Sequence, residues 1–233
     1  MDCHGSMPSP RQPQHHWVIG DVHGCAESLA CLLGRLPSRD RLVFCGDVVN
    51  RGPHIAETME LAWELMSSGR AVWLKGNHEA DLLRALQQER DPTSPALAGN
   101  ATYRQLGARR CRTWIERLAQ LPEVYWGEGW AATHAGFDPL TWEPHLSIRL
   151  PFWESYDGRF GEVVVGHTPG LEVRRIRQIV LIDTAACYGG QLTAYCPETG
   201  EVRQAEGLRH RQWSSAAFEA IAAQAARMAR CAI

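Results

Sequence analysis

The sequence predicts an α/β fold whose second half becomes α+β. In the first half, short apolar runs alternate with segments that carry leucine at helical spacing, which indicates strand, helix, strand and a parallel sheet. After residue 121 the pattern becomes mainly strand-like. The chain has 233 residues, of which 45% are hydrophobic. Because that is enough for one large core, we expect a single domain over residues 16–233.

The elements of the first half follow from periodicity and from the residues that interrupt it. The first strand is expected to begin at Trp17, and leucines 29, 32, 33 and 36 mark one face of a helix that residues 37–40 break. Further strands are predicted over 41–45 and 71–74, and further helices over 56–68 and from Gly76 to about Glu89. Right-handed crossovers would then place the strands parallel, with a ligand crevice at their carboxyl ends.

Residues 91–121 are expected to form a helical cap insert, with a proline-containing loop followed by a helix over about 103–119. The second half is predicted to form a largely separate sheet. Its strands are expected over 123–126, 130–133, 162–165 and 180–182, with a hairpin of 191–195 and 201–204. An alanine-rich helix over residues 213–233 is expected to pack on the core.

Composition argues against several classes of protein. The net charge of −2 and the pI near 6.5 leave no basic surface for nucleic acid. Residues 1–15 are polar and proline-rich, so we expect a flexible tail and no signal peptide, and no run approaches the ~18 apolar residues of a membrane span. Eight cysteines without C-x-x-C spacing indicate reduced thiols and a cytoplasmic location. The oligomeric state is open, with a monomer as the working expectation.

Asp47 is the residue around which the predicted site is arranged. It ends a buried strand, where a carboxylate is costly unless a cation lies beside it, and two metal ions would be the strongest compensation. We therefore expect Asp47 to bridge two metals. Arg51 follows on the same loop, and its guanidinium is suited to binding a phosphate.

Polar motifs recur at the predicted strand ends. The first, Gly-Asp-x-His-Gly at residues 20–24, is expected by chance at a given position with a frequency of ~10⁻⁵ or less. It is followed in order by GDVVNRG, GNHE, THAG and GHT. A lone aspartate after a strand is usually a helix cap, and a lone buried histidine is usually a core residue. The ordered series reverses that expectation and favours ligands.

This series resembles the calcineurin-like metallophosphoesterases, and within them the bacterial phosphoprotein phosphatase branch. The resemblance runs from about Trp17 to Ala205 and includes IDTAACYGGQLTA near its end. It implies a four-layer αββα sandwich of two mixed sheets flanked by helices. It also implies that Asp21, His23 and Asp47 hold one metal, and that Asp47, Asn77, His134 and His167 hold the second.

The resemblance assigns catalysis to Asp47, to His78 beside the leaving group and to Arg51 as the phosphate clamp, with Asn77 also contacting substrate. Oxygen and imidazole ligands without thiolate favour Mn²⁺, with iron or zinc as alternatives. Two such ions can hold a bridging hydroxide that attacks phosphorus directly.

The expected activity is that of a serine/threonine-protein-phosphatase-like phosphomonoesterase, acting on a phosphorylated protein or a small phosphate ester. Asn50 stands where protein phosphatases usually have aspartate, and we expect it to offer His78 only an amide carbonyl. That difference favours phosphoanhydrides, and NRGP also resembles symmetrical bis(5′-nucleosyl)-tetraphosphatases, so a nucleotide substrate is the alternative. An inactive binding scaffold is the alternative of another class.

Two further positions depart from the family pattern. The phosphate-binding arginine usually found after Trp153 is missing, which leaves Arg149 or Arg159 as substitutes. Ala185 stands where glycine is common, so that loop is expected to differ. Asp183 before it is equally consistent with orienting the metal-binding histidines and with capping a turn.

Overall fold

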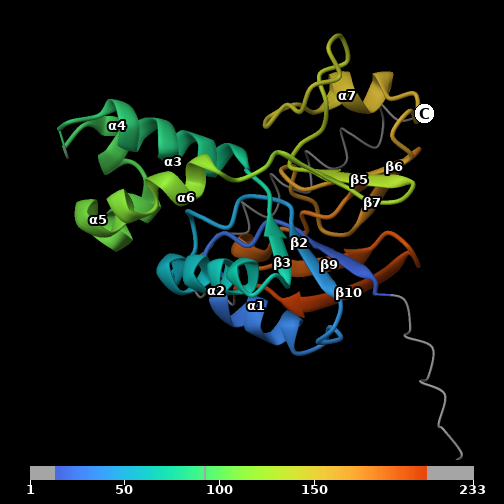
Figure 1. Ribbon diagram of the computed structural model, residues 1–233, viewed down its shortest axis with the longest axis horizontal. Helices are drawn as coiled ribbons and strands as arrows, with labels where there is room; N and C mark the ends of the chain where they lie inside the picture. The colour runs from blue at the N-terminus through green and yellow to red at the C-terminus, as the bar shows by residue number, and fades with distance from the viewer. Residues whose placement is uncertain (1–13, 92, 209–233) are drawn as a thin grey trace, which may run out of the picture.

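Two five-stranded sheets lie face to face in the computed structural model, which describes residues 14–91 and 93–208 (Figure 1). The strand order in the first sheet is β10-β9-β1-β2-β3. Its strands β1, β2 and β3 are parallel, as predicted, and β9 runs antiparallel to β1. These strands are β1 (His16–Ile19), β2 (Arg41–Phe44), β3 (Ala71–Trp73), β9 (Gln191–Cys196) and β10 (Glu201–Glu206).

The second sheet has the order β4-β5-β6-β8-β7. Its three inner strands β5, β6 and β8 are parallel, and antiparallel β4 and β7 form the edges. The strands are β4 (Val124–Trp126), β5 (Trp130–Thr133), β6 (Glu162–Val165), β7 (Arg174–Ile176) and β8 (Ile179–Leu181). Both sheets are thus mixed, and each contains three neighbouring parallel strands, whose carboxyl ends meet at one edge.

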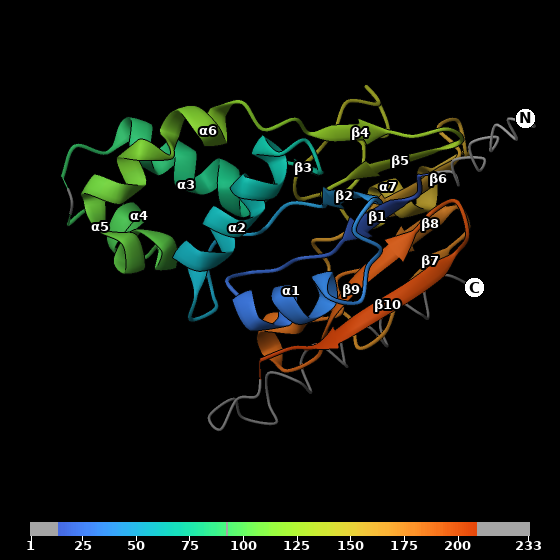
Figure 2. The same cartoon turned by 60° about the horizontal axis from the view of Figure 1, so that its bottom comes forward.

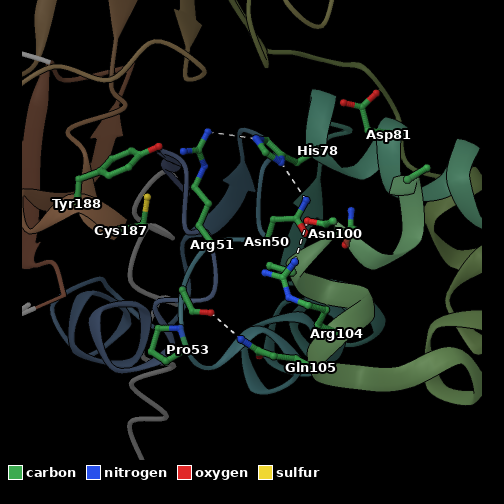
Figure 3. Close-up of a pocket in the computed structure, with 14 residues that line it drawn as sticks. Asn50, Arg51, Pro53, His78, Asp81, Asn100, Arg104, Gln105, Cys187 and Tyr188 are labelled. Carbon is green, nitrogen blue, oxygen red and sulfur yellow. Dashed lines mark hydrogen bonds between the residues drawn. The ribbon is translucent and has the colours of Figure 1, made fainter. Parts of the chain in front are cut away.

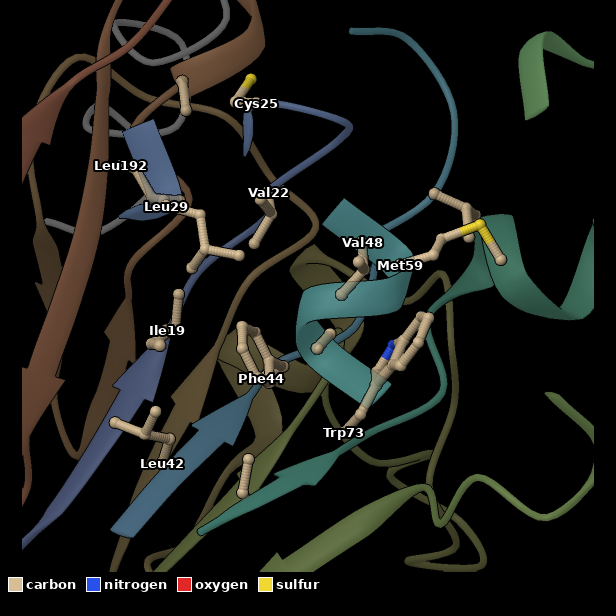
Figure 4. Close-up of a cluster of buried hydrophobic side chains, with 14 of the residues drawn as sticks. Ile19, Val22, Cys25, Leu29, Leu42, Phe44, Val48, Met59, Trp73 and Leu192 are labelled. Carbon is tan, nitrogen blue, oxygen red and sulfur yellow. The ribbon is translucent and has the colours of Figure 1, made fainter. Parts of the chain in front are cut away.

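Successive side chains of each strand point to opposite faces of the sheet, so each strand contributes both to the core between the sheets and to the core under the helices. Val18 and Val43 point between the sheets, where they pack with Val164 and Val180. Their neighbours Ile19 and Phe44 point the other way, into a cluster with α1 (Ala26–Leu33) and α2 (Ile55–Ser67) (Figure 4). Leu29 and Met59 are the helix residues that meet them there.

A shorter helix covers the far face of the second sheet. Helix α7 (Leu150–Ser155) contributes Phe152 and Trp153, which pack with Val163 and Val165 from β6. The order helices, sheet, sheet, helix confirms the predicted four-layer sandwich.

Helices α3 (Asn77–Gln88), α4 (Pro95–Ala98), α5 (Ala101–Thr113) and α6 (Ile115–Ala119) form a lobe at one side of the sandwich (Figures 1 and 2). The expected loop contains α4, because Pro95 begins a helix that Ser94 caps. The single helix expected over 103–119 is instead two helices, and the first is kinked at Gly107.

Other differences concern weakly patterned segments. Strand β7 and helix α7 were not predicted, because three and six residues are too few to show a period. The hairpin β9–β10 belongs to the first sheet, whereas the sequence placed it with the second. The expected tail reaches into ordered structure, since the Gln14 side chain donates to the Arg39 carbonyl.

The rest of the predicted tail and the helix predicted over 213–233 lie outside the described residues. Within residues 14–91 and 93–208, no helix is long and apolar enough to cross a membrane.

The kink in α5 allows a test of backbone strain. Gly107 has φ 73° and ψ 166°, and a Cβ added there would meet nothing within 4 Å, so the effect of Gly107→Ala is confined to the backbone. We expect it to lower the free energy of unfolding by about 1–3 kcal/mol in urea denaturation. Gly34→Ala is the control, since φ −64° suits alanine, and it should raise stability by about 0.4–1 kcal/mol. Equal stability of the two variants would contradict this account.

Candidate metal centre

The side chains that the sequence predicts as ligands converge where the strands of both sheets end. Asp21 follows β1, Asp47 follows β2 and Asn77 follows β3, while His134 and His167 come after β5 and β6. A cavity of about 200 Å³ opens between these loops. His134 is fully buried and does not line it, and the other predicted ligands do: Asp21, His23, Asp47, Asn77 and His167.

Asp47 occupies the middle of this group. Its Oδ2 atom lies 3.5 Å from Nε2 of His23 and 3.5 Å from Nε2 of His134. Its Oδ1 atom accepts a hydrogen bond of 3.0 Å from the backbone N–H of His78. One carboxylate therefore faces both halves of the predicted centre, as a bridging ligand must.

The tautomers of two histidines are set by backbone carbonyls. Nδ1 of His23 lies 2.7 Å from the Val49 carbonyl, and Nδ1 of His134 lies 2.8 Å from the Cys45 carbonyl. Because a carbonyl only accepts, each Nδ1 carries the proton and each Nε2 presents a lone pair. Two bare nitrogens thus face one carboxylate oxygen of Asp47. A cation between these acceptors resolves their repulsion, so the residues fit a metal.

Burial changes the pKa values of the predicted ligand side chains in a way that suits the binding of cations. Desolvation, together with neighbouring carboxylates, raises the pKa of Asp21 and of Asp47 well above the usual range. Burial lowers the pKa of His134 to about 3 and that of His167 to about 4. Bound cations would favour ionised carboxylates, and the histidines are already in the neutral form that ligates metals.

Asn77 and His167 complete the second half of the cluster. The Oδ1 atom of Asn77 lies 2.9 Å from Nε2 of His134 and 2.9 Å from Nδ1 of His167. The remaining ring nitrogen of His167, Nε2, is buried without a hydrogen-bond partner among the described residues. The backbone N–H of His167 donates to Oδ1 of Asp21, which ties the two sheets together at the site.

Asn50 contacts His78, but the expected orientation of its amide is wrong. Its Oδ1 accepts from the Thr102 backbone N–H at 3.0 Å and from the Thr102 hydroxyl at 2.8 Å. Since a backbone N–H only donates, this oxygen is fixed, and the amide nitrogen lies 2.9 Å from Nδ1 of His78. Asn50 therefore donates to His78, whose proton lies on Nε2. Burial and the Arg51 charge lower the pKa of His78 to about 4.

Arg51 and His78 direct N–H groups to one place. The Nη2 atom of Arg51 lies 3.2 Å from Nε2 of His78, and its guanidinium lies 5.0 Å from the ring centroid of Tyr188 (Figure 3). Because a guanidinium only donates and the proton of His78 lies on Nε2, these two N–H groups face each other without an acceptor. One anionic oxygen at the cavity mouth would accept from both and relieve their repulsion.

A second arginine also reaches the cavity. Arg149 lines it, and its Nε is buried without a partner among the described residues. Arg159 is engaged elsewhere, paired with Asp157 at 2.7 Å and 3.8 Å above the ring of Trp142. Of the two candidates from the sequence, Arg149 lines the metal cavity and Arg159 does not.

Asp183 caps a turn, which is one of the two roles that the sequence left open. Its Oδ1 accepts from the Ala185 backbone N–H at 3.0 Å, which caps the turn, and its side chain also lines the metal cavity. Burial raises the pKa of Asp183 to about 6. Ala185 adopts φ 62°, a left-handed conformation that explains why glycine is common there.

Glu79 is a site residue that the sequence reasoning missed. It is completely buried, and its carboxylate accepts from the backbone N–H groups of Asp47, Val48, Val49 and Gly76 at 2.8–3.2 Å. It therefore holds the loop after β2 against the start of α3. The signal was present in GNHE, where a glutamate three residues after Gly76 is placed to accept from the Gly76 N–H, which is the glutamate half of a capping box.

Comparison with known proteins decides the family. A model described as calcineurin-like phosphoesterase matches residues 15–193. The chain belongs to this family. It is a metallophosphoesterase, a hydrolase that acts on phosphate esters.

Relatives of this phosphoesterase include nucleotide hydrolases. A Bacillus cereus protein named bis(5′-nucleosyl)-tetraphosphatase PrpE [asymmetrical] is 28% identical over 216 residues, covering 76% of this chain and 87% of the relative. A Xylella fastidiosa protein named bis(5′-nucleosyl)-tetraphosphatase, symmetrical, is 34% identical over 140 residues, covering 58% of this chain and 46% of the relative.

Solved structures share the fold of this phosphoesterase. A protein provisionally named a diadenosine tetraphosphatase has a TM-score of 0.65 at 24% identity, over 87% of this chain and 97% of that one. A serine/threonine phosphatase from Saccharomyces cerevisiae has a TM-score of 0.56 at 15% identity, over 85% and 82%.

The role of Glu79 can be tested by Glu79→Gln. An amide nitrogen in place of one oxygen would leave two buried N–H groups without an acceptor, at about 1–3 kcal/mol each, so the free energy of unfolding should fall by roughly 2–6 kcal/mol. Metal affinity, measured by calorimetry, should weaken as the Asp47 loop loosens. The control is Glu64→Gln on the exposed face of α2. If both variants unfold at the same urea concentration, Glu79 does not hold the loop.

Proposed function

We propose that this phosphoesterase hydrolyses the phosphoanhydride chain of dinucleoside tetraphosphates. The hydrogen bond from the Asn50 amide to Nδ1 of His78 carries this proposal. This bond needs an unprotonated Nδ1, and burial and the Arg51 charge also favour neutral His78, so Nε2 donates a hydrogen bond to the leaving oxygen instead of a full proton. A leaving phosphate has a second pKa of about 6 and departs without a proton, whereas a serine alkoxide needs one. The names of the relatives support the same substrate class.

The ligand geometry supports two metal positions that share Asp47. When bound, two divalent ions supply a nucleophile at neutral pH and neutralise charge on the phosphate. Manganese suits a shell of carboxylate, amide and imidazole ligands. One ion would be held by Asp21, His23 and Asp47, and the other by Asp47, Asn77, His134 and His167.

The arginines bind and orient the substrate in this proposal. Arg51 donates to the phosphoryl group under attack on the side of His78, and Arg149, which lines the same cavity, donates to it as well. Because a guanidinium presents planar paired donors, the two side chains fix the phosphate with its leaving oxygen toward His78.

A phosphorylated protein is the second candidate substrate. The observation in its favour is the pair Arg51 and Arg149, since two guanidinium groups also suit the dianion of a phosphomonoester.

We also propose a cytoplasmic location, because the six described cysteines are all free thiols.

The two substrates can be compared directly. We expect kcat/KM with Mn²⁺ to be roughly tenfold or more higher for diadenosine tetraphosphate than for a phosphoserine peptide. The reason is that neutral His78 donates a hydrogen bond but is a poor donor of a full proton. ADP alone as product would indicate symmetrical cleavage, and AMP with ATP asymmetrical cleavage. Asp47→Asn should abolish both activities. A higher value for the peptide would overturn the proposal in favour of a protein phosphatase.

Asn50→Asp should change this preference. Aspartate can keep the Thr102 bonds with one oxygen and accept from Nδ1 of His78 with the other, which raises the pKa of His78 above about 4. The protonated form then persists to higher pH. Activity on the peptide should therefore rise about tenfold relative to the dinucleotide, and should be lost as pH rises through the new pKa.

The control for this change is the double variant Asn50→Asp with His78→Asn, which should show no rise in activity on the peptide relative to the dinucleotide. A substrate ratio that stays constant in Asn50→Asp across pH 5–9 would show that the amide orientation does not set leaving-group preference.

A further inference from the structure

A second cavity adjoins the metal cavity on the side of His78 (Figure 3). We call it the lobe cavity. Its volume is about 670 Å³, against about 200 Å³ for the metal cavity, and the two share Arg51, His78 and Tyr188. The smaller cavity suits a phosphate, and the larger one lies within the range of small-molecule sites. A substrate can therefore extend from one into the other past His78.

Three segments from different parts of the chain wall the lobe cavity. The loop after β2 contributes Asn50 to Pro53, and the short helix η1 (Ala186–Tyr188) contributes Cys187 and Tyr188. The third wall is the lobe itself, through α4 and the first turns of α5. The helical insert thus forms part of the cavity wall.

The lobe cavity combines an aromatic ring with anchored positive charge. Tyr188 forms one side, flanked by the guanidinium of Arg51. On the other side, Nη1 of Arg104 donates to the carbonyls of Ala98 and Gly99 at 3.1 and 2.9 Å, which fixes the position of the side chain. The only carboxylate among the described lining residues is Asp81, and it is paired with Arg84 at 2.8 Å.

Amide groups complete the wall. Gln105 is held by the Ile55 backbone N–H and the Gly52 carbonyl, and Asn100 caps α5 through the Tyr103 N–H. Their rigidity means that little conformational entropy is lost when a ligand binds. An aromatic ring, fixed cations and amides suit a ligand that has a flat ring and phosphate groups, which is a nucleotide.

We infer that the lobe cavity binds the nucleoside of the departing nucleotide, with Tyr188 and Arg104 as its specificity-determining residues. This inference rests on the proposed function for the identity of the substrate, because His78 faces the leaving oxygen and the lobe cavity lies beyond it. Stacking on a ring accepts any base, so the site recognises the class of nucleotides more than one member.

The test uses inhibitors that differ only by the nucleoside. Hydrolysis of an aryl phosphate by the full-length enzyme with Mn²⁺ is inhibited with α,β-methylene-ADP and, in parallel, with methylenediphosphonate. Both carry the same bridged diphosphate, and neither is cleaved between its phosphorus atoms. We expect the nucleotide to inhibit the wild type roughly tenfold more tightly, because only it fills the lobe cavity.

Single substitutions test which residues cause the difference between the two inhibitors. Tyr188→Ala and Arg104→Ala should each reduce this ratio of inhibition constants severalfold, and Tyr188→Phe should keep it because the ring remains. The matched control is Arg109→Ala, an exposed arginine on the same helix that does not line the cavity, which should keep both the ratio and aryl phosphate hydrolysis.

The outcomes separate this inference from the proposed function. Equal inhibition of the wild type by the two compounds would overturn the inference, even if diadenosine tetraphosphate is cleaved. A ratio that the Tyr188→Ala and Arg104→Ala variants leave unchanged would overturn it as well. A tenfold ratio that both variants reduce would support it, even if the dinucleotide is not cleaved and the proposed function fails.

Discussion

The carboxylate of Glu79 is the constraint on which the metal centre depends. It accepts four backbone N–H groups, three from the loop after β2 and one from Gly76, and thereby joins the ends of two neighbouring strands. The approach is so close that a Cβ on Gly76 would lie 2.2 Å from Oδ1 of Asp47. A buried carboxylate is stable there because hydrogen bonds to an ionised group are worth about 1.5–3 kcal/mol each. The position of Asp47 follows from this arrangement.

Strain accompanies this geometry. Positive φ values occur at His23, Asp47, Asn50, Arg51 and His167, all of which lie at the site. Such conformations cost about 1–3 kcal/mol each and persist only where the surroundings over-determine them. Here the surroundings are two sheets that pack face to face around a buried cluster, and a set of loop hydrogen bonds between them. The rigid sandwich thus holds side chains in positions that isolated loops would not adopt.

The sequence was sufficient for the parts of the structure that repeat a pattern. Strands followed by Asp47, Asn77, His134 and His167 could be placed because each motif stood at the end of an apolar run, and the structure brings these residues together. The sheet that the β9–β10 hairpin joins could not be read from the chain, because pairing of β9 with β1 joins residues about 175 positions apart. The direction of the Asn50 amide was equally hidden, since Thr102 fixes it from 52 residues away.

Through the bond between Asn50 and Thr102, the lobe acts on His78 as well as lining the lobe cavity. Thr102 lies in the first turn of α5, so the insert sets the protonation of His78 while its neighbouring residues shape the lobe cavity. Substitutions in one peripheral segment can therefore alter two properties of the accepted substrate together: the size of its leaving group, and how basic that leaving group can be. A scaffold with this coupling could diversify among phosphate substrates by exchanging an insert, while its metal ligands stay constant.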